Sequence, residues 1–140
     1  MKRTLLAAAL VAAATAAPAT AKPAEPDWPT WNVTTTGQTT ALGYVDATCY
    51  FTPQRWVHDY GNTLVHAVAV TSGALSTTVR CELLWDGEHR GDQTWTQDGP
   101  VLYAEDGFSY VSDTGVQICV TASATFATTN VSAPRTCKYV

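Results

Sequence analysis

Strict alternation of apolar and polar residues is the feature that most limits the folds open to this chain. From Val116 to Phe126, apolar side chains occupy every second position over eleven residues. Because successive side chains of a strand point to opposite faces, this pattern predicts a β-strand with one buried face. The alternation recurs from Gly43 to Phe51 and from Thr77 to Trp85. After residue 21, no window shows the apolar spacing of an amphipathic helix.

Further strands are expected on either side of short turn signals. Leu64 to Thr71 is a nearly continuous apolar run that suits a central strand, and a last strand is expected from about Ser132 to Tyr139. Asp86-Gly87 and Asp106-Gly107 predict tight turns, the second between two short strands. Seven or eight short strands predict an all-β fold, namely an immunoglobulin-like antiparallel β-sandwich, with a closed barrel as the alternative.

The first residues have the features of a secretory signal peptide. Lys2 and Arg3 give a positive start, Leu5 to Ala17 is apolar, and Ala19-Thr20-Ala21 fits a small-x-small cleavage site. The apolar stretch is too short to cross roughly 30 Å of hydrocarbon. We therefore expect residues 1–21 to be removed, the product to be secreted and extracellular, and the mature chain not to insert into a membrane.

The remainder divides into a leader and one domain. Residues 22–33 contain three prolines and two tryptophans and are expected to form an extended leader, followed by a single β-sandwich domain at residues 34–140. Cleavage removes two of the eight basic residues and none of the twelve acidic ones, which leaves a net charge of −6. An acidic surface with scattered basic residues disfavours nucleic acid as a partner.

Four cysteines, all after residue 21, predict two disulfides in an exported chain. Cys119 lies on the polar face of its strand, and a hairpin that turns near Thr128 would place Cys137 directly opposite it. Cys49 and Cys81 both lie on apolar faces and suit an interior bridge. The competing map is of the immunoglobulin type and pairs Cys49 with Cys119 and Cys81 with Cys137. It requires Cys119 to turn inward.

The string VQICVTASATF (residues 116–126), the alanine-rich export signal and the threonine-rich domain with two disulfides together resemble small secreted proteins of actinobacteria. These proteins are mostly uncharacterised, and many are similar to immunoglobulin-like sandwiches. The resemblance covers most of the mature chain loosely. It implies a fold and carries over no functional residue.

Motifs for covalent or metal-dependent catalysis are missing from the chain. We therefore assign no catalytic, metal-binding or cofactor-binding residue, and we expect no enzyme activity and no cofactor. His66 lies in an apolar run and is interpreted as a side chain tucked into the sheet. His89 neighbours Glu88, but adjacent residues of an extended chain point apart. Asp86, Glu88 and Asp92 are interpreted as a solvated polar turn rather than a calcium site.

Aromatic residues in the expected loops and leader form the candidate ligand surface. They are Trp28, Trp31, Trp56, Tyr60 and Trp95. Exposed flat rings suit a sugar or a protein contact, whereas rings that cap the ends of the sandwich would be structural. The expected function is a secreted non-catalytic module that binds an unidentified protein or polysaccharide, or that has a structural role. The alternatives are a protease inhibitor that presents Glu88 to Pro100 as a loop, a carbohydrate-binding module and, last, a small hydrolase.

Overall fold

The computed structural model describes residues 30–39, 43–54, 62–109 and 115–140, which form eight antiparallel β-strands. The strands are β1 (Trp31–Gln38), β2 (Tyr44–Gln54), β3 (Asn62–Thr71), β4 (Ser76–Trp85), β5 (Glu88–Asp98), β6 (Val101–Ser109), β7 (Val116–Thr125) and β8 (Asn130–Tyr139). Four of them coincide with the strands expected from the alternation and the apolar run, namely β2, β3, β4 and β7. The all-β class is confirmed.

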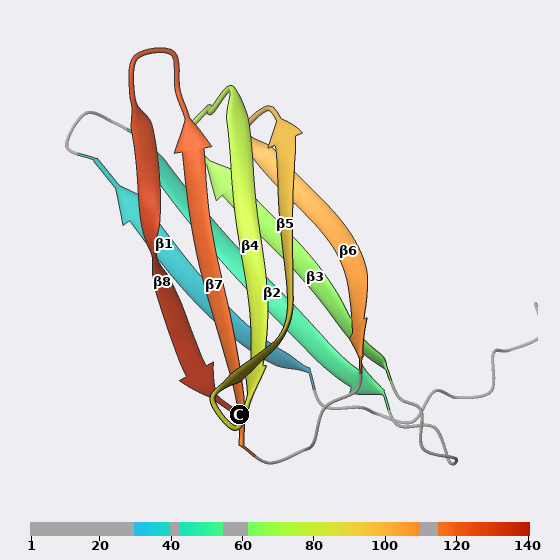
Figure 1. The fold of residues 1–140 in the computed structure, drawn as a ribbon. Coiled ribbons are helices and arrows are strands. Elements are labelled where there is room, and N and C mark those ends of the chain that lie inside the picture. The colour runs from blue at the N-terminus through green and yellow to red at the C-terminus, as the bar shows by residue number, and fades with distance from the viewer. Residues whose placement is uncertain (1–29, 40–42, 55–61, 110–114) are drawn as a thin grey trace, which may run out of the picture.

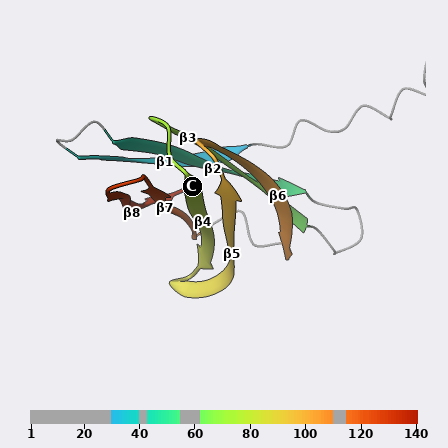
Figure 2. The same ribbon diagram turned by 90° about the horizontal axis from the view of Figure 1, so that it is seen from above.

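The eight strands form two sheets that pack face to face as a sandwich (Figure 1). The first sheet has the order β1-β2-β3-β6, and the second has the order β5-β4-β7-β8. Figure 2 shows the two layers from above. The order of the first sheet departs from that of a constant-type immunoglobulin domain, where the second strand lies between the first and the fifth. Here β2 lies between β1 and β3, so the first three strands form a meander.

The core lies between the two sheets because each strand turns one face inward. Its largest fully buried side chains come from both layers and include Phe51 and Leu102 in the first sheet and Leu83 and Ile118 in the second. Burial of one such side chain contributes about 1.5–3 kcal/mol to folding. The alternate side chains of the same strands point outward and form the two outer faces of the sandwich.

Both expected disulfides are present, and the immunoglobulin-type pairing is excluded. Cys49–Cys81 joins β2 to β4 across the sandwich, with a Cα–Cα distance of 5.8 Å and both side chains fully buried. Cys119–Cys137 joins directly opposed positions of the neighbouring strands β7 and β8. One bridge therefore ties the two layers together, and the other ties an edge strand to its own sheet.

A one-residue bulge in β8 brings Cys137 opposite Cys119. Counted from the tip of the β7–β8 hairpin, the regular pairing would place Thr136 there. Pro134 and Arg135 together oppose a single residue of β7, which shifts the register by one. The uniform register assumed from the sequence is therefore wrong near the hairpin tip, although the disulfide that it predicted is correct.

Two local expectations are wrong because pairing with a neighbouring strand overrides the local turn signals. Asp106-Gly107 lies inside β6, which pairs with β3 without interruption, so the expected turn and its two short strands are one strand. Residues Glu88–Asp98 form β5 along β4 rather than a projecting loop. Asp86-Gly87 is the expected hairpin turn, with φ angles of 52° and 76°. The sandwich begins at Trp31, three residues before the expected start of the domain.

Candidate functional site

Two of the five aromatic residues proposed for ligand binding lie in the described part of the chain, and both pack against the core. Trp31 pairs with Phe51, and Trp95 pairs with Val79, so both indoles lie on the inward half of their strands. Each is partly buried against the apolar core. These two rings therefore cover the core. Trp28, Trp56 and Tyr60 lie outside the described residues.

The outer face of the first sheet presents most of the exposed apolar surface of the described residues. Five of the seven exposed large apolar or aromatic side chains lie there. They are Tyr44, Leu64, Val70, Val101 and Tyr103. Because a folded domain seldom leaves such side chains grouped on one face, this face is a candidate interaction surface.

Three side chains from β3 and the edge strand β6 meet on this face. The rings of His66 and Tyr103 lie 6.2 Å apart, centroid to centroid, and their planes are within 23° of parallel. Tyr103 donates a hydrogen bond of 2.5 Å to Glu105 Oε1, and the same oxygen lies 3.6 Å from His66 Nε2. Tyr50 of β2 is the cross-strand neighbour of His66. Two rings and a carboxylate thus share one open surface.

The Tyr103 phenol is electrostatically coupled to Glu105. The hydrogen bond to the carboxylate raises the pKa of Tyr103 above its ordinary value, and the small loss of hydration and the negative charge of Glu105 act in the same direction. The phenol therefore stays protonated and remains a donor to Glu105 throughout the physiological pH range. The carboxylate is held beside the rings as a result.

His66 lies elsewhere than the sequence indicated. It is not tucked into the sheet, since its side chain points outward and is 34% exposed. Glu105, directly before the Asp106-Gly107 turn signal, lies inside β6. The pair comes from separate strands and could exchange a proton. However, it lies on an open sheet face where water has free access, which is poor ground for acid–base chemistry.

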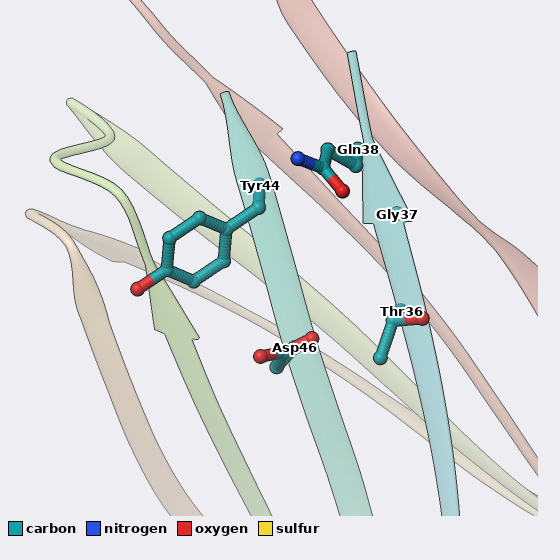
Figure 3. A pocket seen from close by; sticks show the side chains of 5 residues that line it. All are labelled: Thr36, Gly37, Gln38, Tyr44 and Asp46. Carbon is teal, nitrogen blue, oxygen red and sulfur yellow. The ribbon is translucent and has the colours of Figure 1, made fainter. Parts of the chain in front are cut away.

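A shallow hollow of about 300 Å³ lies on the same outer face, where β1 and β2 run side by side. Figure 3 shows its lining: Thr36, Gly37 and Gln38 come from β1, and Tyr44 and Asp46 come from β2. The register pairs Thr36 with Asp46 and Gln38 with Tyr44, so four outward side chains surround the bare backbone of Gly37. The Gln38 amide extends toward β2 in this view.

The outer face of the second sheet carries a compensated ion network. Glu82 is only 5% exposed there. Its carboxylate accepts a hydrogen bond of 2.8 Å from Arg135 Nε and lies 3.4 Å from Arg80. Asp92 pairs with Glu82 on this face, and a bulge in β5 turns His89 to the same face. The His89 Nε2 atom lies 4.0 Å from Glu82 and 3.9 Å from Asp92. Because the charges neutralise one another, the network serves stability better than ligand binding.

Two of the three acidic residues considered for calcium are paired with arginine side chains. Asp92 accepts a hydrogen bond of 2.6 Å from Arg80, and Glu88 lies 2.9 Å from Arg90. Among the residues that the structure describes, no group of three or more histidines, cysteines or acids could hold a metal ion. Nor does that part of the chain contain a helix with the length and apolarity needed to span a bilayer.

The exposed rings predicted from the sequence lie in expected loops and the leader, whereas the residues of this face lie in strands. Tyr44, Asp46 and Tyr50 are the outward half of the alternation in β2, and that signal was visible in the sequence. The approach of His66 to Tyr103 depends on the β3–β6 pairing and has no local signal. Comparison with protein-family models, curated proteins and solved structures finds no match for this chain.

Proposed function

We propose that this protein is a secreted, non-catalytic binding module, that the outer face of its first sheet is the ligand surface, and that the ligand is a glycan. The observation that carries this proposal is the nearly parallel pair of His66 and Tyr103 rings with the Glu105 carboxylate beside them. Tyr103 is 57% exposed, so its ring is available for stacking.

The chemistry of the face suits a sugar. Apolar ring faces stack on the C–H faces of a pyranose, and neighbouring carboxylate and hydroxyl groups accept and donate hydrogen bonds to its hydroxyl groups. Thr34 and Thr48 lie on the same face, and their hydroxyl groups are hydrogen-bonded to each other at 2.8 Å. A flat sheet face also suits an extended polymer better than it suits a compact small molecule, which favours a closed pocket.

Secretion is part of the proposal. The pattern of residues 1–21 supports it, and two disulfides in a small domain are compatible with an extracellular protein. The immunoglobulin-like kinship is likewise a proposal. Two packed antiparallel sheets and a bridge between them support it, whereas the pairing of β2 with β3 differs from the constant-type order.

The other candidate functions have less support. A protease inhibitor needs a projecting ordered loop, and residues Glu88–Asp98 are paired with β4 along their length. A purely structural module would not need two rings and a carboxylate grouped on an exposed face. We therefore treat glycan binding as the leading hypothesis, with an unidentified protein partner as the alternative.

The proposal predicts that the rings on the first sheet carry glycan affinity. A polysaccharide retained by the mature protein in affinity electrophoresis should bind Tyr103→Ala about tenfold more weakly in calorimetry, because the stacking surface is lost. Tyr103→Phe should keep most of the affinity because it keeps the ring. Tyr139→Ala is the matched control, since Tyr139 is 75% exposed on β8 of the other sheet. Equal loss in both alanine variants, or retention of no polysaccharide, would contradict the proposal.

Export has its own test. Expression of the full chain in a secreting host should release a protein whose intact mass begins at Lys22 and is lower by four hydrogens than the fully reduced form. Retention of the first 21 residues in the released protein would contradict the assigned signal peptide.

A further inference from the structure

Charge is distributed unequally between the two sheets. All four described lysine and arginine side chains lie in the second sheet, and they are Arg80, Arg90, Arg135 and Lys138. The acids of the second sheet bind three of these cations directly. The described strands of the first sheet carry acids without a lysine or arginine. Among the residues that the structure describes, the first sheet therefore presents net negative charge to a ligand.

Asp46 is the most available of these acids. Its carboxylate lies in the hollow between β1 and β2 (Figure 3), and no hydrogen bond or ion pair joins it to another described residue. By contrast, Glu105 on the same face is engaged by Tyr103 and lies near His66. The hollow thus presents a free anionic acceptor at the edge of the proposed ligand surface.

Asp46 has a second possible acceptor beside it in the hollow. Gln38 lines the same hollow, and its amide oxygen can accept a hydrogen bond. A primary ammonium group has three N–H donors and one positive charge, so it can bond to a carboxylate and to an amide oxygen and keep one donor for water. A hydroxyl group offers one donor and no charge, and a sulfate or carboxylate would be repelled.

The hollow and the ring pair lie within reach of one ligand. Asp46 and Tyr50 are four residues apart on β2, which corresponds to about 13 Å along the strand. Tyr50 is the cross-strand neighbour of His66, and Val68 and Thr48 lie between the two sites on the same face. A chain of several sugar units that runs obliquely from β2 across β3 to β6 would therefore contact both.

We infer that the hollow at Asp46 binds a protonated amino group of the glycan, and hence that the ligand is an amino-sugar polymer with free primary amines. This inference rests on the proposed function and deepens it by naming the substrate class. The rings would supply stacking for any pyranose, and Asp46 would supply the preference for the cationic one.

The test compares two oligosaccharides that differ only in whether their amino groups are free or acetylated. Glucosamine oligomers and N-acetylglucosamine oligomers of equal length are titrated into the mature protein at about pH 5, where the free amines carry a positive charge. We expect the glucosamine oligomer to bind about tenfold more tightly, because the N-acetylated oligomer cannot form the charge-assisted hydrogen bond to Asp46. We also expect this preference to shrink at high salt.

Two variants distinguish a specific contact at Asp46 from the effect of the protein's overall negative charge. Asp46→Asn should remove the preference for the free amine. Asp98→Asn is the matched control, since Asp98 is an exposed acid of β5 in the other sheet, and this variant should keep the preference. Equal affinity for the two oligomers, or equal effects of the two variants, overturns the inference. If the N-acetylated oligomer binds through Tyr103 without a preference, the proposed function stands and this inference fails; if neither oligomer nor any other polysaccharide binds, both fail.

Discussion

Replacing Cys49 and Cys81 together with alanine is expected to lower the free energy of unfolding by about 4 kcal/mol. The bridge spans 32 residues of sequence, and closing a loop of that length restricts the unfolded chain by about 3.7 kcal/mol. Both side chains are fully buried between the sheets, so the alanines also leave unfilled core volume. The measurement is equilibrium unfolding in guanidinium chloride, followed by tryptophan fluorescence.

The other disulfide supplies the control. Replacing Cys119 and Cys137 with alanine opens a loop of 18 residues, which the same relation values at about 3 kcal/mol. That bridge joins two neighbouring strands on the outer face rather than two layers across the core. We therefore expect the first pair to be the more costly to lose. A larger loss for Cys119 and Cys137 would contradict the assignment of the inter-sheet bridge as the main clamp.

The substitution Gly37→Ala is expected to lower the free energy of unfolding by about 3 kcal/mol. A Cβ atom at this position would clash with the carbonyl oxygen of Ser132 and would lie 2.9 Å from the Cα atom of Ala133. Both contacts are with the backbone of β8, which cannot rotate away. The chain needs glycine here because β1 crosses β8 at close range, and this crossing holds one side of the sandwich together.

A second contact, a hydrogen bond, also holds β1 against β8. The buried Thr35 hydroxyl donates a hydrogen bond of 2.6 Å to the carbonyl oxygen of Pro134, which lies in the bulge of β8. Because a bulge interrupts the ladder of backbone hydrogen bonds, this hydroxyl supplies a partner that β7 does not. Two nearby residues of β1 therefore contact β8: Thr35 bonds to the bulge, and Gly37 packs against the residues just before it.

Gly107→Ala is the matched control for Gly37→Ala. Gly107 also lies in a strand of the first sheet, but a Cβ atom there would meet only the Thr63 carbonyl oxygen, at 4.0 Å. We expect its effect on the free energy of unfolding to stay within about 0.5 kcal/mol, since alanine also reduces the freedom of the unfolded chain. Similar losses from the two variants, measured by thermal and denaturant unfolding, would contradict the close approach of β1 to β8.

The alternation of inward and outward side chains along each strand accounts for the part of the fold that could be predicted. The alternation in β2, β4 and β7 located those strands and also sorted the cysteines between the inside and the outside, from which the pairing followed. The turn at Asp86-Gly87 was predictable because its positive φ angles suit these residue types. Asp106-Gly107 has the same local signal, yet β3 pairs straight through it, and nothing near this dipeptide in the sequence reports that partner.

The candidate site also has a part that the sequence predicts and a part that depends on strand pairing. Short-range order in the sequence determined which residues of each strand face outward, and it thereby placed Tyr44 and Asp46 on a surface. Only the tertiary structure decided that β6 returns to lie beside β3, and so brought Tyr103 and Glu105 to His66. The physical reason is that strand parity is a property of the local backbone, whereas the choice of neighbouring strand is set by how two whole sheets bury their apolar faces against each other.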